Sequence, residues 1–154
     1  MMKLTTESIA MPYELNPEQA TENFSWREFY CPLAKSLPLT DLALHHVTKL
    51  QILREELGRG LKVNSGYRSP EHNARVGGAT QSMHLEFATD VTPVAITARD
   101  QWRPGGSALV MWCDRIAGIA EDLGFSGIGR YDSFVHLDCR AVIQRPQARW
   151  DKRS

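Results

Sequence analysis

Residues 64–91 read NSGYRSPEHNARVGGATQSMHLEFATDV. A short strand is expected at 61–64, leading into this stretch, and a second strand at 87–91. The Ser-Pro pair at 69–70 has the residue types of an N-cap and a first helical position, so a helix of one or two turns should follow and stop at the glycine pair 77–78. The stretch therefore predicts two strands joined through a short helix.

Two longer segments outside this stretch have apolar residues at helical spacing. The first begins at Thr40 or Asp41 and ends at Gly58, and the second covers 107–124. Both end at a glycine, which is a common residue at the C-terminal stop of a helix. A capping-box pattern at Ser25–Glu28 predicts a further, shorter helix.

A hairpin is expected near the end of the chain, where 127–131 faces 133–139. Because the helices come first and the strands cluster in the middle and at the end, the order favours an α+β fold over alternating βαβ units. We expect a single domain at 23–154, with a small, mostly antiparallel sheet packed against helices, after a polar and irregular arm at 1–22. The locally basic tail 145–153 is expected to be a solvated end, with contact to an anionic cell wall as the alternative.

Composition restricts the class of protein. The chain has 154 residues, of which 42% are hydrophobic, and its 18 basic and 18 acidic side chains give a formal net charge of zero. A neutral chain lacks the positive field on which general nucleic-acid and membrane-surface binding depend. The longest apolar run, 108–113, has six residues, far fewer than the ~20 that span a bilayer. We therefore expect no nucleic-acid partner and no membrane insertion.

The N-terminus and the cysteines bear on the compartment. The N-terminus lacks the apolar core of a signal peptide, which predicts synthesis in the cytoplasm and a separate route out if the protein acts outside. Cys31, Cys113 and Cys139 are widely spaced and form no CxxC pair. Their number and spacing favour reduced thiols packed as small hydrophobic side chains over a zinc ribbon or a disulfide framework.

Metal-ligating side chains occur in two separate parts of the chain. A catalytic zinc usually takes three protein ligands from His, Asp, Glu or Cys and leaves a fourth position for water. His84, Asp90 and His136 could supply such a set, two from one segment and one from a distant strand. A lone histidine in a small domain is more often a surface or a satisfied core residue, so the metal hypothesis depends on all three residues together.

Zinc-dependent hydrolysis also needs a carboxylate that takes the proton of the water and passes it to the leaving amine. Asp138 fits this role, because side chains two apart on a strand share a face and Asp138 would lie beside His136. Asp132 is also an even number of positions from His136 and would point to the same face. It lies near a turn, however, where the alternation of side chains is less regular. We therefore predict Asp138 as the first candidate for the base and Asp132 as the second.

Three motifs follow one another along the chain: the stretch at 64–91, GIGRYDSFVHLDCR at 127–140 and ARW at 148–150. In this order they resemble the zinc D-alanyl-D-alanine carboxypeptidase family, peptidase family M15, over about residues 23–150. The likeness is to single-domain members of the kind found among small phage endolysins, whose fold is shared with the hedgehog signalling domain. The resemblance implies a hedgehog-like catalytic domain at 23–154.

The resemblance also implies roles for individual residues. The zinc ligands of the family fall on His84, Asp90 and His136, and the implied cofactor is one Zn²⁺ per chain. Arg68 matches an arginine that lies near the metal and contacts the substrate in relatives; its alternative is a structural turn residue bonded to backbone carbonyls. Ser82 matches a serine beside the metal or the substrate, with a simple turn or cap as its alternative.

The implied reaction is hydrolysis of an amide bond next to a D-amino acid in the peptidoglycan stem peptide. The enzyme would be a metallopeptidase with D,D- or L,D-carboxypeptidase or endopeptidase activity. A phage or prophage origin would make it an endolysin or a virion-associated enzyme that acts at the bacterial cell wall after release or from the virion, with other virion proteins as partners. The alternative is a catalytically inactive domain of the same fold that serves as a phage structural or cell-wall-binding module.

Two departures from the family pattern bear on the site. The family usually reads HxxGxAxD, whereas the step from His84 to Asp90 is six positions here and the glycine is missing. One residue fewer in a strand would turn Asp90 to the other face of the sheet. We expect the missing residue to shorten the preceding turn instead, so that Asp90 keeps its face. Glu86 is the alternative oxygen ligand. Several relatives carry an acid three residues before the last histidine, and Ser133 occupies that position here, so one of the two aspartates named above must serve as the base.

Overall fold

The structure is a computed structural model that describes residues 18–94 and 107–154. Of the arm expected at 1–22, residues 1–17 therefore lie outside the described part. The helices are η1 (Trp26–Phe29), α2 (Asp41–Leu57), α3 (Pro70–Arg75), η2 (Met83–Leu85), α5 (Ala108–Asp122) and η3 (Arg140–Ile143), where η marks a 3-10 helix. The strands are β2 (Leu61–Ser65), β3 (Ala88–Pro93), β4 (Gly127–Arg130), β5 (Val135–Asp138) and β6 (Ala148–Asp151).

In the described residues, the five strands form one sheet in the order β2-β3-β5-β4-β6. β3 pairs antiparallel with both β2 and β5, and β4 pairs antiparallel with β5. β6 runs parallel to β4 at the edge of the sheet. The α+β class and the small, mostly antiparallel sheet predicted from the sequence are confirmed.

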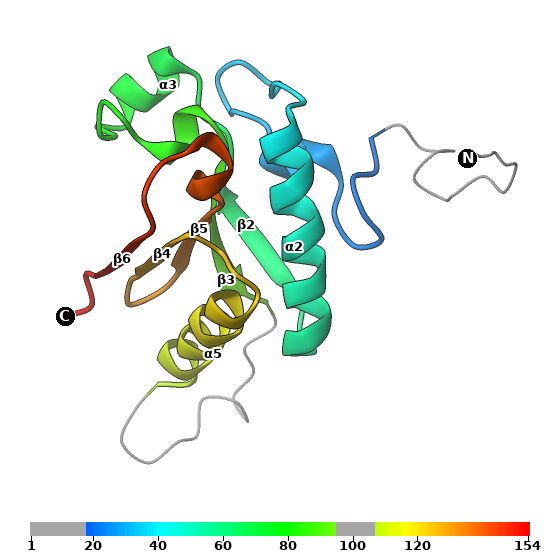
Figure 1. The fold of residues 1–154 in the computed structure, drawn as a ribbon, viewed down its shortest axis with the longest axis vertical. Helices are drawn as coiled ribbons and strands as arrows, with labels where there is room; N and C mark the ends of the chain where they lie inside the picture. Colours follow the sequence, from blue (N-terminus) through cyan, green and yellow to red (C-terminus); the bar gives the residue numbers. More distant parts are fainter. Residues whose placement is uncertain (1–17, 95–106) are drawn as a thin grey trace, which may run out of the picture.

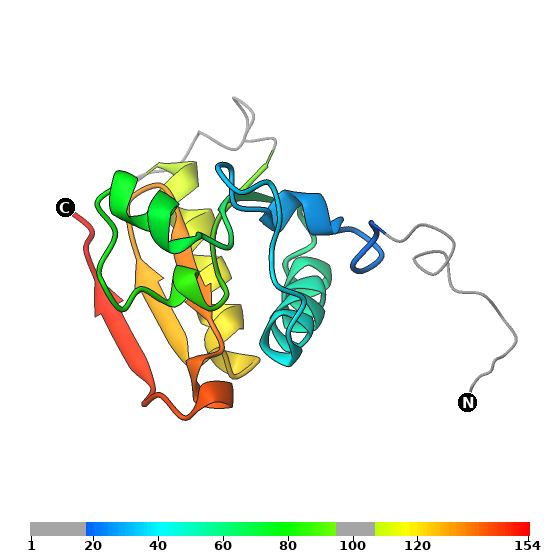
Figure 2. The same cartoon turned by 90° about the horizontal axis from the view of Figure 1, so that it is seen from above.

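The helices divide between the two faces of the sheet. α2 and α5 pack against each other and cover one face, while the segment with α3 and η2 lies on the other side (Figure 1, Figure 2). β5 shows the alternation, because Val135 and Leu137 are buried in the core and His136 and Asp138 point the other way. One face therefore belongs to the core and the other is available for a site. Of the helices in the described ranges, none has the length and apolar character that a membrane crossing needs.

The ends of the two long helices follow local sequence signals. Thr40 accepts a hydrogen bond from the backbone N–H of Ala43 at 3.1 Å, and α2 stops at Gly58, whose φ of 70° suits glycine. Ser107 caps α5 in the same way by accepting from the N–H of Val110 at 3.2 Å. Both helices begin where the apolar spacing in the sequence predicted them.

The prediction of a solvated C-terminal tail is wrong for residues 148–151. These residues form β6, in which Ala148 lies opposite Gly127 and Trp150 lies opposite Gly129. Four alternating residues are too short a pattern to distinguish an edge strand from a tail, because the pairing partner is set by the tertiary fold.

The cysteines are free and buried, as the sequence predicted. Burial raises the pKa of the Cys113 thiol to about 11 and that of the Cys139 thiol to about 12. Both side chains therefore stay protonated near neutral pH and pack as small apolar groups.

A buried histidine joins α2 to β3. The side chain of His46 is 0% exposed, and its Nε2 lies 2.9 Å from Oγ1 of Thr89. Its ring meets the rings of Phe87 and Phe125 edge-on, with centroids 5.0 and 5.4 Å apart. Burial lowers the pKa of His46 to about 3, because the charged imidazole would lose its hydration. The ring is therefore neutral in the folded protein.

Replacing His46 with glutamine should make the protein less sensitive to mild acid. Because the pKa of His46 falls from 6.5 to about 3 on folding, the unfolded chain binds more protons between these values and the free energy of unfolding falls as the pH drops below 6.5. Between pH 6.5 and 5 this term amounts to about 1.5 kcal/mol. Urea titrations across this range should show a correspondingly smaller loss for His46→Gln, whose amide can still donate to Thr89.

His45→Gln is the matched control, since His45 is the exposed neighbour on the same helix. This variant keeps His46 and its contact with Thr89, so it should show the larger loss seen for the unmodified protein. A pH profile of His46→Gln that matches the unmodified protein would contradict the neutral, buried state of His46.

Candidate metal centre

A row of residues crosses the sheet on the face away from α2 and α5. The register sets Asp90 opposite His136 in the antiparallel pair of β3 and β5. The row continues through Ser65 on one side and through Gly129 and Trp150 on the other. Directly opposite residues on neighbouring strands share a face, with Cβ atoms about 4.5–5.5 Å apart. Strand pairing thus makes neighbours of Asp90 and His136, which are 46 positions apart in the sequence.

His84 reaches this row from a turn outside the sheet. It lies in η2, where Oγ of Ser82 accepts a hydrogen bond from the backbone N–H of His84 at 3.2 Å. The Nδ1 atom of His84 lies 2.6 Å from the carbonyl oxygen of Gly66. Because His84 is not on β3, its six-residue step to Asp90 does not determine which face Asp90 takes. The turn between η2 and β3 accommodates the shorter step, and Asp90 still faces His136.

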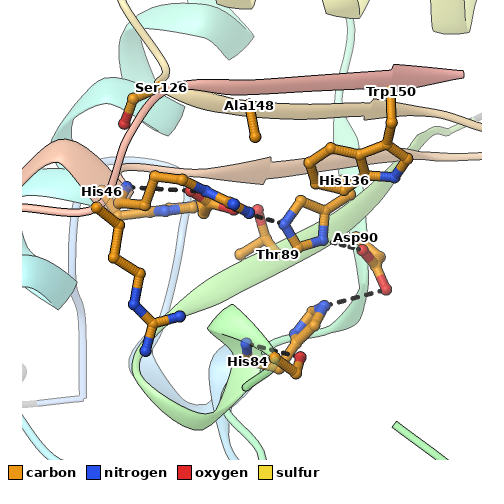
Figure 3. Close-up of polar contacts among 12 residues, drawn as sticks. His46, His84, Thr89, Asp90, Ser126, His136, Ala148 and Trp150 are labelled. Atoms are coloured by element: carbon orange, nitrogen blue, oxygen red, sulfur yellow. Dashed lines mark hydrogen bonds and ion pairs between the residues drawn. The ribbon is translucent and has the colours of Figure 1, made fainter. Parts of the chain in front are cut away.

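The three predicted ligands meet around the carboxylate of Asp90. Nε2 of His84 lies 3.3 Å from Oδ2 of Asp90, and Nδ1 of His136 lies 3.1 Å from Oδ1. One ligand atom of each residue lies within 4.8 Å of the others. Figure 3 shows both imidazole rings pointing toward the carboxylate. The structure therefore brings together His84, Asp90 and His136.

The atoms that face one another have the chemistry of a zinc site. Each histidine turns one ring nitrogen to Asp90, while its other nitrogen faces an oxygen, the Gly66 carbonyl for His84 and the Asp138 carboxylate for His136. Metal-binding histidines commonly have such an oxygen partner on the far nitrogen. Two imidazole nitrogens and one carboxylate oxygen fit zinc and leave a fourth position for water.

The charges of the site favour an ionised Asp90. Burial by itself would raise the pKa of Asp90, but hydrogen bonds and charge from His136 and His84 hold it well below its usual range. Burial by itself would lower the pKa of His136, but the hydrogen bonds to Asp138 and Asp90 outweigh it and raise the pKa. A carboxylate that stays ionised between two imidazoles is an attractive position for a cation.

The three residues line an open cleft of about 470 Å³ that has an aromatic wall formed by Tyr131, Phe134 and Trp150. The rings of Tyr131 and Phe134 stack at 4.3 Å with an interplanar angle of 10°. Nε1 of Trp150 donates to the hydroxyl of Tyr131 at 3.0 Å. The Trp150 ring lies 5.0 Å from that of His136, and Figure 3 shows these two rings side by side. The cleft thus combines apolar surface with a few converging polar groups, as ligand sites commonly do.

Arg68 lies beside the candidate ligands and is held by a neighbouring amide. Its Nη2 is 3.9 Å from Oδ2 of Asp90, and its Nη1 donates to Oδ1 of Asn73 at 3.2 Å. Asn73 in turn donates to the carbonyl of Ala79 at 2.9 Å. Gly78 leaves room for this arrangement, since a Cβ there would come within 2.7 Å of Cγ of Asn73 and 3.0 Å of Nη1 of Arg68. The guanidinium is therefore positioned by side chains that follow it in the same segment.

Asp138, the first candidate for the base, lies on the opposite side of the His136 ring from Asp90. Its side chain is 0% exposed, and its carboxylate is bonded to Nε2 of His136 and to the guanidinium of Arg140. Of the described residues that line the cleft, Asp90 alone carries a carboxylate.

The other two acids lie elsewhere. Asp132, the second candidate for the base, accepts hydrogen bonds from the backbone N–H and the hydroxyl of Ser154 at 3.2 and 2.8 Å. Glu86, the alternative ligand, lies 3.9 Å from Arg145 and is not part of the cluster around Asp90. Both carboxylates thus have their charged or polar partners outside the cleft.

The sequence analysis assigned no role to several residues of the cleft, among them Tyr131, Arg140 and Trp150. A signal for two of them is the pair Gly127 and Gly129, because glycines inside a strand often mark the close approach of another group. A Cβ at Gly127 would overlap the carboxylate of Asp138, which binds Arg140, and a Cβ at Gly129 would overlap the indole of Trp150. No comparable signal points to Tyr131.

A small α+β domain with a His-Asp-His cluster in a cleft, supported by a neighbouring arginine, suits a hydrolase. Comparison with protein families places the chain in the peptidase class, since a family model matches residues 22–138. The matched family is Peptidase M15, a zinc-dependent family, and the chain belongs to it. This confirms the resemblance seen in the sequence motifs. No curated protein matches the chain.

Substituting Gly78 with alanine should destabilise the support of Arg68. The new Cβ would press on the buried side chain of Asn73, and relieving this overlap requires Asn73 or Arg68 to move. We expect the free energy of unfolding to fall by about 1–3 kcal/mol, as overpacking usually costs. Urea denaturation followed by circular dichroism measures this difference.

Gly118→Ala is the matched control, because a Cβ at Gly118 in α5 meets no atom within 4 Å. Alanine is the better helix former, so this variant should be unchanged or more stable by up to about 1 kcal/mol. Equal effects of Gly78→Ala and Gly118→Ala would show that Gly78 is not needed for space.

Proposed function

We propose that this protein is a zinc-dependent peptidase that hydrolyses an amide bond next to a D-amino acid in the peptidoglycan stem peptide. The observation that carries the proposal is the convergence of His84, Asp90 and His136 in the cleft of a Peptidase M15 domain. We propose that it acts as a D,D- or L,D-carboxypeptidase or endopeptidase. The support for this specificity is the resemblance of the sequence motifs to that family.

His84 Nε2, the Asp90 carboxylate and His136 Nδ1 would hold one Zn²⁺ per chain. The bound metal supplies Lewis-acid chemistry, which polarises a carbonyl and lowers the pKa of water. The chain contributes a ligand set that is already assembled, because the strand register aligns Asp90 with His136 and the Gly66 carbonyl orients His84. Little rearrangement is then needed on binding.

Two cleft residues can donate hydrogen bonds to a substrate oxygen. Arg68 presents a guanidinium within 3.9 Å of Asp90 and is oriented by Asn73, so it can bind a carboxylate or a carbonyl of the substrate next to the reacting bond. The hydroxyl oxygen of Tyr131 accepts from Trp150, which leaves the phenolic proton for a substrate oxygen. Both groups line the same cleft as the ligands.

The proposal includes a place of action. We infer that the substrate partner is the peptidoglycan stem peptide and that the enzyme acts at the bacterial cell wall, as a phage or prophage endolysin or as a virion-associated enzyme beside other virion proteins. The support is the resemblance to single-domain, endolysin-like members of the family. The formal net charge of zero is compatible with either role.

One observation favours a second candidate function. Asp138 is enclosed by His136 and Arg140, and Asp132 is bonded to Ser154, so neither aspartate is among the residues of the cleft wall in the part of the chain that the structure describes. A domain that lacks a base would bind cell-wall peptide or a phage structural partner without cutting it. The two functions predict the same zinc site and differ in turnover.

The purified, untagged protein should contain about one zinc ion per chain after zinc loading and dialysis. His84→Ala and His136→Ala should each abolish this binding, because two ligands do not retain the metal. Inductively coupled plasma mass spectrometry measures the metal content. His45→Ala, at an exposed position outside the site, is the control that should keep the zinc. Absence of zinc in the loaded, unmodified protein would overturn both the peptidase function and the metal site.

The zinc-loaded protein should release peptides from purified peptidoglycan, with activity lost to a chelator and restored by zinc. Arg68→Ala should lower kcat/KM by about 100-fold while zinc stays bound, because a donor to the reacting region is removed. Arg68→Lys should recover part of the loss, since the charge returns without the bidentate fork. Chromatography with mass spectrometry of the products identifies the bond that is cut.

Arg75→Ala is the matched control, because Arg75 is an exposed arginine of α3 that pairs with Glu71. It should leave hydrolysis unchanged. Full zinc occupancy without any peptide release, from cell walls of several compositions, would instead favour the binding module.

A further inference from the structure

We propose that Asp138 is a positioning residue, which with Arg140 holds the imidazole of His136 in the orientation and tautomer that metal binding requires. This role differs from that of a base in proton transfer, which the sequence pattern suggested for Asp138. The inference rests on the proposed function only in that it takes His136 as a metal ligand.

Both oxygens of the Asp138 carboxylate have hydrogen-bond partners. Oδ1 accepts from the backbone N–H of Arg140 at 3.0 Å and from its Nε at 2.9 Å. Oδ2 accepts from Nη2 of Arg140 at 2.7 Å and lies 2.7 Å from Nε2 of His136. With two contacts on each oxygen, the carboxylate is bound in a single orientation.

The same Asp–Arg arrangement occurs a second time in the chain without a histidine. Asp151 accepts from the backbone N–H of Arg153 at 3.0 Å, from its Nε at 2.9 Å and from its Nη2 at 2.6 Å. The Asp151 side chain is 49% exposed, whereas that of Asp138 is 0% exposed. The sequence Asp-x-Arg therefore forms this Asp–Arg clamp locally, in which the arginine donates to the carboxylate from its backbone N–H, Nε and Nη2. The clamp at Asp138 differs from the one at Asp151 because it is buried and contacts His136.

The surroundings of Asp138 provide the space and the cover for this contact. Gly127 lies opposite Asp138 in the register of β4 and β5, and any Cβ there would overlap the carboxylate. The guanidinium of Arg140 lies 5.4 Å from the centre of the Trp150 ring, which also packs against His136. The carboxylate is thus enclosed between the sheet, the guanidinium and the indole, and is not part of the cleft wall.

A consequence for His136 follows from the acceptor character of a carboxylate. When His136 binds a metal through Nδ1, the nitrogen that faces Asp90 at 3.1 Å, the ring proton lies on Nε2. The Asp138 carboxylate, which accepts hydrogen bonds and donates none, lies 2.7 Å from Nε2 and accepts from it. Carboxylate partners of this kind fix the tautomer and ring orientation of metal-binding histidines.

Nitrogen-15 NMR of the histidine side chains tests the tautomer directly in the unmodified protein. The zinc-loaded protein should show His136 bound to the metal through Nδ1, with the ring proton on Nε2 and a single ring orientation. Ligation through Nε2, or exchange between two ring states, would overturn the proposal, and this measurement needs no variant to fold.

Asp138→Asn tests the energetic consequence, because an amide can donate to Nε2 and no longer selects one tautomer. Competition with a chelator should show zinc affinity reduced about 10–100-fold, the usual effect of removing such a partner. Asp151→Asn is the matched control, since it breaks the same Asp–Arg clamp where no histidine is present. It should leave the zinc affinity and the His136 signals unchanged.

The outcomes separate a positioning role from a base and from failure of the proposed function. Zinc affinity within twofold of the unmodified protein in Asp138→Asn, together with a large loss of peptide hydrolysis, would overturn the proposal and make Asp138 the proton-transfer group. Weaker zinc binding with an altered His136 tautomer in Asp138→Asn alone would support it. If the unmodified protein takes no zinc, the peptidase function fails. The positioning role is then decided in the metal-free protein, where Asp138→Asn should change the side-chain signals of His136 and Asp151→Asn should not.

Discussion

The candidate site depends on the register between β3 and β5, which sets Asp90 directly opposite His136. A slip of one residue would turn Asp90 toward the helices and bring Thr89 to the cleft, because the side chains of a strand alternate with period two. The core opposes such a slip, since Thr89 is bonded to the buried His46 and Leu137 is fully buried on the helix side of β5. The residues that stabilise the fold therefore also hold the candidate ligands in place.

Space on the site face comes from residues with no side chain. Strand β4 presents Gly127 and Gly129 to this face, where its neighbours present Asp138 and Trp150. Large polar and aromatic groups can then lie flat over the middle of the sheet and contact His136, which a Cβ on β4 would prevent. Gly78 likewise leaves room for Arg68. The shape of the cleft therefore depends on its glycines as well as on its larger side chains.

Much of the secondary structure and the convergence of the candidate ligands was predictable, because the signals are local or chemically specific. Thr40 and Ser107 start their helices through hydrogen bonds within one turn, which a capping residue announces in the sequence. His84, Asp90 and His136 were selected by residue type and motif, and the fold brings them within 4.8 Å. The strand at 148–151 escaped prediction, because its partner β4 lies on another part of the chain and four residues carry too little periodicity.

The amino-acid sequence was sufficient to establish the α+β class, the Peptidase M15 motifs and the identity of the three candidate ligands, because these depend on residue type and spacing. It could not establish which nitrogen of each histidine faces Asp90, or that Asp138 lies behind His136 with Arg140. Parity along a strand assigns a side chain to a face, but it does not say how a ring is rotated or which neighbour encloses a carboxylate. Those properties arise from strand register, from the glycines of β4 and from the indole of Trp150, which come together only in the folded chain.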